Sequence, residues 1–394
     1  MTSLANISPP ASGIQFTSLP PLSLYIHIPW CVKKCPYCDF NSHEAKGAHP
    51  EAKYVAALIY DLEQAIPQIY GRKVQSVFFG GGTPSLLSAA ALDDILAAVR
   101  ALVRPDANAE ITLEANPGTF EAEKFSAYAR SGVNRLSIGI QSFNPKHLGA
   151  LGRIHDDKEA RRAIDMAKHE FENFNLDIMY ALPQQTLVEA LQDIDTALSF
   201  SPPHLSAYHL TLEPNTLFYL HPPKLPDDEL AADMQQAIEK KLCDAGYENY
   251  ETSAFAQPAQ RSRHNLNYWE FGDYLGIGAG AHSKISFKNN ILRMMRRKHP
   301  QSYMDNVARA EHVAEQSEVS LDALPFEFMM NALRLREGFP VALFQQRTAL
   351  PLSVMEKELR EAESRGLISR DYQRIAPTQT GRLFLNDLLQ IFLR

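Results

Sequence analysis

The sequence has little cysteine and no long apolar run. Four cysteines stand among 394 residues, which is too few for a disulfide framework in a chain of this length. No segment approaches the ~18 uninterrupted apolar residues of a membrane-spanning helix, and the N-terminus has no charged segment followed by an apolar one. We therefore expect a cytoplasmic protein that is neither secreted nor inserted into a membrane.

Positive charge is also scarce. The formal net charge is -7, which argues against nucleic acid as a partner because broad binding to it depends on neutralising phosphates. One local basic run contains Arg293, Arg296, Arg297 and Lys298. It is interpreted as a solvated face, and the alternative is a site for propionates, phosphates or anionic lipid.

Three of the four cysteines stand close together. Cys31, Cys35 and Cys38 fall within eight positions, a spacing that suits metal ligands better than disulfides. The fourth, Cys243, lies near the end of a helix expected over residues 227–245. There we expect a small, buried apolar residue.

The chain divides into three parts. Residues 1–20 lack periodicity and predict a flexible leader. Residues 21–286 alternate short β-branched runs with stretches of helical period, which predicts an α/β domain, a partial or full parallel (β/α) barrel. The expected strands are residues 24–28, 76–79, 110–113, 135–140, 176–179 and 205–210. The expected helices between them include residues 51–66, 89–103, 158–169 and 187–198.

Residues 287–394 change to consecutive helices. Helices are expected over residues 326–336 and 352–364, followed by a hairpin at residues 367–375 and a last helix from Thr380. The order predicts a smaller, mainly helical, winged-helix-like C-terminal domain. Such domains serve DNA binding or packing against partners, and the acidic chain favours packing.

Polar and glycine-rich positions follow the expected strands. In chain order they are the cysteine run, residues 80–83, Glu114, Gln141, Asp177 and residues 207–208. The carboxyl ends of barrel strands form the active-site mouth. These residues are therefore predicted to surround one site.

The cysteine run places three thiolates in one loop after the first strand. They are able to bind three corners of a cubic [4Fe-4S] cluster and to leave one iron open for a ligand. Zinc is the alternative, with His43 as the nearest fourth ligand, but three cysteines of one loop suit it poorly.

Several motifs carry a resemblance to a known family. They read YIHIPWCVKKCPYCDF, FFGGGTPS, LEANPG, LSIGIQSF and DIMYALPQQT. The chain from about Leu24 to its end resembles the radical SAM superfamily, in the branch of oxygen-independent coproporphyrinogen III oxidase and the haem chaperones. The resemblance implies that S-adenosylmethionine (SAM) binds the open iron and that an electron donor reduces the cluster.

The resemblance also implies which residues hold SAM. They are Tyr25, Gly81, Gly82, Thr83, Glu114, Gln141, Arg153, Asp177 and Ala207. Glu114 is suited to accept from an ammonium or a ribose hydroxyl, and Arg153 to pair with a carboxylate. A tight turn is the alternative for the glycines, and structural salt bridges are the alternative for the charged residues.

Three features separate the members of the branch. The oxidase pattern has a fourth cysteine where this chain has Phe40, and its N-terminal extension is longer. The run Arg263-His-Asn-Leu-Asn-Tyr-Trp269 resembles the HNxxYW motif of the haem chaperones, with His264 as the expected haem ligand and His282 as its competitor. A histidine beside aromatic residues is otherwise a hydrogen-bonded core residue.

The sequence thus predicts a haem chaperone that passes haem to acceptor proteins, membrane-associated respiratory enzymes among them. The alternative within the resemblance is the oxidase, which converts propionates to vinyls. A winged-helix regulator with a redox-sensing cluster is the third class, and the net acidity argues against it.

Overall fold

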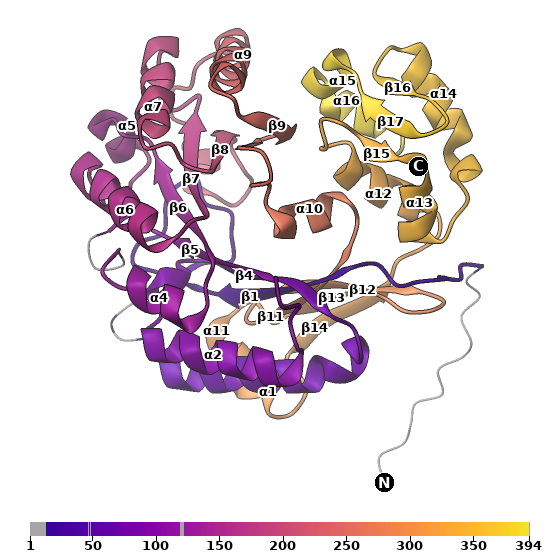
Figure 1. Cartoon of the computed structure of the whole chain (residues 1–394), viewed down its shortest axis with the longest axis horizontal. Coiled ribbons are helices and arrows are strands. Elements are labelled where there is room, and N and C mark those ends of the chain that lie inside the picture. The colour runs from indigo at the N-terminus through magenta and orange to yellow at the C-terminus, as the bar shows by residue number, and fades with distance from the viewer. Residues whose placement is uncertain (1–12, 46, 48, 119–121, 394) are drawn as a thin grey trace.

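The computed structural model describes residues 13–45, 47, 49–118 and 122–393 (Figure 1). Its larger unit is built on a mixed sheet with the strand order β14-β13-β12-β11-β1-β4-β5-β6-β7-β8-β10-β9. The run from β11 to β8 is parallel. Because β14 and β9 form separate edges among the described residues, the sheet is a partial barrel.

All six strands expected from the sequence are confirmed. They are β1 (Leu22–Ile28), β4 (Val74–Gly81), β5 (Glu110–Ala115), β6 (Arg135–Gln141), β7 (Phe174–Tyr180) and β8 (His204–His209). The sequence did not predict the strands that flank them. These are β9 (Glu248–Glu251), β10 (Ala254–Ala256), β11 (Asp273–Ile277), β12 (His282–Ser286), β13 (Ile291–Arg296) and β14 (Val313–Glu318).

Helices cover the outer face of the curved sheet (Figure 1). They include α1 (Glu51–Ile69), α2 (Ala89–Leu102), α4 (Phe125–Ser131), α6 (Asp157–Glu170), α7 (Leu187–Ser199) and α9 (Asp228–Asp244). Two of them begin at complete capping boxes, Asp156 with Glu159 and Thr186 with Glu189. Each box satisfies two backbone N–H groups that a helix start leaves free.

Alternation along β1 separates the core from the site. Leu24 and Ile26 are fully buried in the apolar core beneath the helices. Because successive side chains of a strand point to opposite faces, Tyr25 and His27 lie on the inner face of the sheet. The sheet thus turns its polar residues inward.

The C-terminal unit has its own core. It contains α12 (Leu324–Ala332), α13 (Val341–Thr348), α14 (Glu356–Ser364), α15 (Gln379–Leu383), α16 (Leu385–Gln390) and the sheet of β15 (Phe339–Pro340), β17 (Arg374–Pro377) and β16 (Ile368–Arg370). Phe328 makes edge-to-face contacts with Phe339 and Phe344, at centroid distances of 5.0 and 5.1 Å. The expected helices and hairpin are therefore present, in a winged-helix-like order.

The border between the units differs from the expected one. Residue 287 falls between β12 and β13, which pair with each other in the main sheet. We therefore propose that the C-terminal unit begins after β14. Of the expected leader, residues 1–12 lie outside the described residues, whereas Ile14 and Phe16 are buried in the C-terminal core.

The expected burial of Cys243 is wrong. The side chain is exposed. On α9 the buried residues Met234, Ile238 and Leu242 recur every fourth position, and this period defines the face that meets the core. Cys243 is one position beyond Leu242 and points away from that face.

A buried carboxylate joins α1 to the flanking strands. Asp61 accepts hydrogen bonds from Arg296 at 3.0 and 3.1 Å, from His312 at 2.9 Å and from Tyr303 at 2.9 Å. Burial alone would raise the pKa of Asp61, but Arg296 and His312 outweigh it and hold the pKa at about 2. Arg296 is 1% exposed, so it is not part of the basic surface expected from the sequence.

Asp61→Asn should destabilise the protein strongly. The amide keeps the shape of the carboxylate but leaves the Arg296 charge buried without a counter-ion, at a cost of about 3–5 kcal/mol. Thermal unfolding should occur at a clearly lower temperature. The control is Asp305→Asn, which breaks an exposed pair with Lys53 and should not shift the transition. Equal transitions for both variants would contradict this role of Asp61.

Candidate cofactor site at the carboxyl ends of the strands

The three clustered cysteines lie in one ordered loop after β1. Cys31 ends β2 (Trp30–Cys31), which pairs with β3 (His43–Glu44) where the loop returns. Inside the loop, Cys38 N–H donates to the Cys35 carbonyl at 3.1 Å. Lys34 donates to the carbonyls of Phe40 and Ser42 at 3.1 and 3.2 Å. These hydrogen bonds fix the conformation of the loop.

Polar groups surround the sulfur atoms. The Ser42 hydroxyl lies 3.7 Å from Cys38 Sγ, and Arg153 Nη1 lies 3.7 Å from Cys35 Sγ. Burial raises the pKa of the Cys31 thiol, and a hydrogen bond from Thr83 opposes it. Hydrogen-bond donors and a guanidinium favour thiolates, the form in which cysteine binds iron.

The three cysteines of the loop suit a multi-iron cluster. In a cubic cluster each cysteine binds a different iron, so its sulfurs need not meet at one point. All three cysteines are partly exposed, and this donor set fits such a cluster.

The glycine turn after β4 lies directly against the cysteine loop. Gly82 N–H donates to the Ile28 carbonyl at 2.7 Å and Thr83 N–H to the Trp30 carbonyl at 2.8 Å. A Cβ atom on Gly82 would lie 2.6 Å from the Trp30 oxygen. Gly81 has φ +112°, a conformation that favours glycine. The turn thus needs glycine for its own packing, and it exposes backbone beside the cysteines.

Glu114 and Tyr25 meet at this turn. Glu114 Oε2 accepts a hydrogen bond from Gly81 N–H at 3.2 Å, and the Tyr25 hydroxyl bonds Nδ1 of His27 at 3.0 Å. Burial, together with the nearby Asp177 carboxyl, raises the pKa of Glu114 to about 8. Two carboxyl groups in one enclosed space favour a cationic ligand, because each of them resists ionising alone.

Arg153 is connected to two other predicted residues, Thr83 and Gln141. Its Nη2 donates to Asn116 Oδ1 and to the Gly139 carbonyl, both at 2.8 Å. Asn116 in turn donates to the Thr83 hydroxyl at 3.1 Å. Sequence reasoning missed Asn116, although it stands in the quoted LEANPG motif. A Cβ on Gly139 would meet the Gln141 amide at 2.8 Å, so Gln141 belongs to the same group.

Ala207 differs from the other predicted residues. It pairs with Ile178 across β7 and β8, and both side chains lie in the apolar core. Its methyl group therefore faces the helices, and only its backbone is left to contact adenine. Tyr208 takes the inner face instead, where Asp177 and Glu114 raise the pKa of its hydroxyl further after burial. The register of β8, which the sequence does not give, decides this.

The HNxxYW run forms α10 (Arg263–Trp269), which lies on the inside of the sheet against β1, β4 and β11 (Figure 1). His264 Nδ1 bonds the Ser76 hydroxyl at 2.9 Å and its Nε2 bonds the Tyr268 hydroxyl at 3.2 Å. Asn267 donates to the Ser23 hydroxyl at 2.9 Å. These hydrogen bonds therefore hold α10 on the inner face of the sheet.

Helix α10 lies at a distance from the cofactor site. Ser76 stands near the start of β4, whereas residues 81–83 end it. At about 3.3 Å per residue, roughly 17 Å of strand separates the two. His264 is 1% exposed, and burial lowers its pKa to about 3. In this structure iron could bind His264 only after one of its hydrogen bonds breaks.

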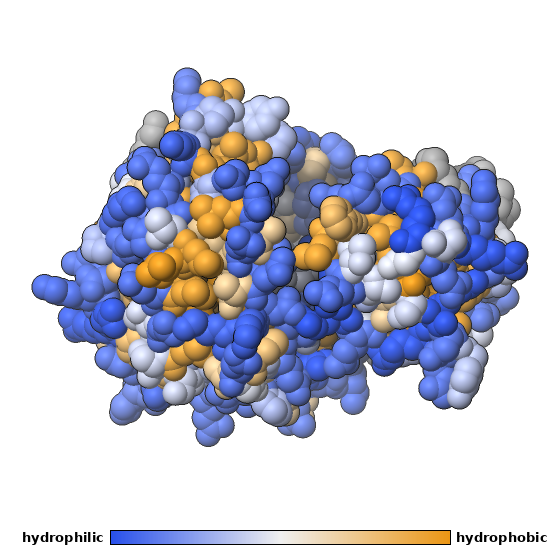
Figure 2. Space-filling model, turned by 90° about the horizontal axis from the view of Figure 1, so that it is seen from above, coloured by the Kyte–Doolittle hydropathy of each residue, from blue (hydrophilic) through white to orange (hydrophobic). Residues whose placement is uncertain are grey.

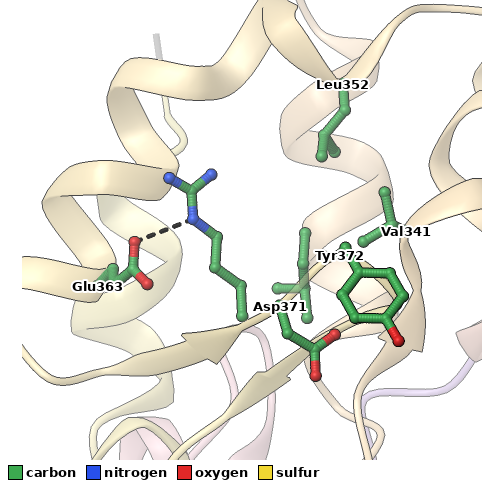
Figure 3. A pocket seen from close by; sticks show the side chains of 7 residues that line it. Val341, Leu352, Glu363, Asp371 and Tyr372 are labelled. Atoms are coloured by element: carbon green, nitrogen blue, oxygen red, sulfur yellow. Dashed lines mark hydrogen bonds and ion pairs between the residues drawn. The ribbon is translucent and has the colours of Figure 1, made fainter.

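A cavity of about 400 Å³ lies in the C-terminal unit (Figure 3). Its lining residues are Val341, Leu352, Glu363, Arg370, Asp371, Tyr372 and Ile375. Arg370 is bound to Glu363 at 2.9 Å and to Glu356 at 2.9 and 3.0 Å. The cation of this cavity is therefore already paired, and none of the predicted site residues lines it.

In the part of the chain that the structure describes, no helix has the length and apolarity to cross a membrane.

Seen from above, the surface is hollowed between the larger unit and the C-terminal unit (Figure 2). Arg293 spans these units, because it donates to Tyr274 at 2.8 Å and to Glu327 of α12.

Comparison with known proteins agrees with this geometry. Residues 25–197 match the Radical SAM superfamily, and residues 319–384 match the HemN C-terminal domain. The solved structure described as "Coproporphyrinogen III oxidase (HemN) from Escherichia coli is a Radical SAM enzyme" superposes with a TM-score of 0.81. It is 24% identical and covers 95% of this chain and 90% of its own, so this likeness bears on the fold. The fold and the cysteine loop define a radical SAM protein.

Curated relatives narrow this class. "Heme chaperone HemW" of Escherichia coli (strain K12) is 50% identical over 379 residues, which are 95% of this chain and 99% of that protein. The protein of the same name from Bacillus subtilis (strain 168) is 34% identical over 94% of this chain and 99% of its own. The chain belongs to the HemW family of the radical SAM superfamily. Membership of the superfamily implies a [4Fe-4S] cluster and SAM.

SAM binding should strengthen as pH rises toward about 8. Below its pKa of about 8 Glu114 is protonated, and a cationic ligand must displace that proton. The dissociation constant should therefore fall by up to about tenfold per pH unit and level off above the pKa. Spectral titration of the reduced, cluster-loaded protein measures it.

Glu114→Gln is the control for this prediction. The amide cannot ionise, so the steep part of the profile should disappear. Both proteins receive the same ligand, so the difference between the two slopes reports Glu114 alone. Parallel profiles for the two proteins would contradict a role for this proton.

Proposed function

We propose that the protein is a cytoplasmic haem chaperone, which binds haem and transfers it to acceptor proteins. The observation that carries this proposal is the 50% identity over 95% of the chain to a protein named "Heme chaperone HemW". Similar coverage at 48% identity in Haemophilus influenzae supports it. The acceptors we propose are membrane-associated respiratory enzymes, and the cluster requires an electron donor.

The cysteine loop supports this function over the oxidase alternative. Phe40 stands where the oxidase pattern has its fourth cysteine, and its side chain is 62% exposed. The three thiolates that leave one iron open are shared by both members of the branch, so the difference is the thiol that Phe40 lacks. On this difference we expect no oxidation of coproporphyrinogen III by this protein.

Each group of residues at the site has a separate role. Cys31, Cys35 and Cys38 would hold the cluster, and the backbone of residues 81–83 lies against the loop that carries them. Glu114 and Asp177 provide negative charge, and the Arg153 guanidinium provides a partner for a carboxylate. When bound, the cluster and SAM supply one-electron chemistry at this site.

The test uses the full chain, reconstituted under anaerobic conditions. Titration with haem should saturate at one haem per chain, and the loaded protein should convert the apo form of a respiratory haem protein to its holo form. The same preparation should release no product from coproporphyrinogen III with SAM and an electron donor. Turnover without haem binding would favour the oxidase. Absence of both would overturn the proposal.

A further inference from the structure

His282 is an accessible histidine at the cofactor end of the sheet. It begins β12 and is exposed, and no hydrogen bond joins its ring to another described residue. The turn before it is held against the cysteine loop, because Asn41 donates to the carbonyls of Ala279 at 3.0 Å and Lys298 at 2.8 Å. The exposed Phe40 precedes Asn41 in that loop. His282 therefore lies beside the cofactor site, whereas His264 lies at the opposite end of the sheet.

The neighbours of His282 suit an iron porphyrin. His282 pairs with Met295 and Lys284 with Arg293 across β12 and β13, and cross-strand partners share one face of a sheet. The partly exposed Met295 offers a soft, apolar contact to a macrocycle. Lys298 is exposed just beyond the end of β13 and is free to meet a carboxylate in solvent.

The charges around His282 favour its neutral form. Partial burial lowers the pKa of His282, Lys298 and Arg293 lower it further, and Glu315, which pairs with Met295 on β14, opposes them. A neutral imidazole has the lone pair that binds iron. Lys298 can also attract a propionate of haem, whereas Arg293 is already paired with Glu327.

Two buried histidines on the inner face of the sheet lack this freedom. His27 bonds Tyr25 through Nδ1 at 3.0 Å and the Asn41 carbonyl through Nε2 at 2.9 Å. His264 is likewise bonded at both ring nitrogens. Iron can bind either imidazole only if one of these hydrogen bonds breaks and leaves a buried polar group without its partner.

We propose that His282 is the axial ligand of a haem docking site, with Met295 against the macrocycle and Lys298 facing a propionate. This assignment rests on the proposed function. It puts haem at the same end of the sheet as the cluster, and it gives α10 a structural role.

The experiment compares haem binding by the unaltered protein, His282→Ala and His264→Ala. An exposed histidine in the last turn of α6, His169→Ala, is the matched control. Haem absorption gives the dissociation constant, and circular dichroism and cluster absorption report the fold. His282→Ala should raise the constant about tenfold or more and shift the haem band. Added imidazole should restore the band by filling the vacated position, which a merely misfolded variant would not permit.

A charge reversal tests the propionate contact separately. Lys298→Glu should weaken binding, while Lys158→Glu, at an exposed lysine near the start of α6, should not. Haem binding unchanged in His282→Ala would overturn the assignment and leave the proposed function standing. If His264→Ala alone shifts the haem band, and added imidazole restores the band, the assignment is also overturned. If the unaltered protein binds no haem, both the assignment and the proposed function fail.

Discussion

Replacing Cys31, Cys35 and Cys38 together by Ala should abolish the broad visible absorption of the reconstituted protein. The described part of the loop contains no other thiol, and its nearest alternative ligand, His43, is one imidazole. Iron held in a cubic cluster needs soft thiolates at its corners, and one nitrogen cannot replace three of them. We expect a complete loss, measured as absorption and as iron per chain after anaerobic reconstitution.

Cys243→Ala is the matched control, because it removes a thiol from the exposed face of α9. It should retain the full iron content. Circular dichroism should be unchanged in both variants, since loop cysteines contribute little to the core. A cluster that persisted in the triple variant would show that iron binds elsewhere.

Gly82→Val should remove the response of the reduced cluster to SAM. Any Cβ on Gly82 would lie 2.6 Å from the Trp30 oxygen and 2.9 Å from the Ile28 oxygen, so the turn must move away from the cysteine loop. The backbone beside the open iron would move with it. The measurement is the change in the electron paramagnetic resonance spectrum on adding saturating SAM.

Gly149→Val adds the same side chain in α5 (Pro145–Ala150), where nothing lies within 4 Å of an added Cβ. That variant should respond as the unaltered protein does. If Gly82→Val still responds fully to SAM, the glycine turn is not part of the SAM site.

The sequence predicted the central strands because each is a short apolar run. Their alternate residues, Leu24, Ile26 and Ile28 in one run and Leu136, Ile138 and Ile140 in another, are buried in the core under the helices, and such runs bounded by turns are a strong local signal. The flanking strands carry no such signal. β14 reads VAEQSE, which has neither apolar character nor alternation, and only its pairing with β13 makes it a strand.

The site was predicted in part for a similar reason. The order of motifs along the chain indicated that the cysteines, Gly82 and Glu114 gather at one edge, because parallel strands end together. The side of the sheet that each side chain occupies could not be predicted, because it depends on the register of the strand. In β8, Ala207 points to the core and Tyr208 to the inner face. For His264, a haem ligand and a hydrogen-bonded core residue have the same sequence, and the structure adds its burial and its two hydrogen bonds.

The outer strand of the sheet has a consequence for how the molecules behave together. Five of the six residues of β14 are exposed, including Glu315 and Glu318. The free backbone groups of an edge strand can pair with a second chain and start aggregation. Carboxylates on that edge repel a second copy of the same strand. Molecules of this protein can therefore be crowded against one another, or against a partner, without their sheets joining.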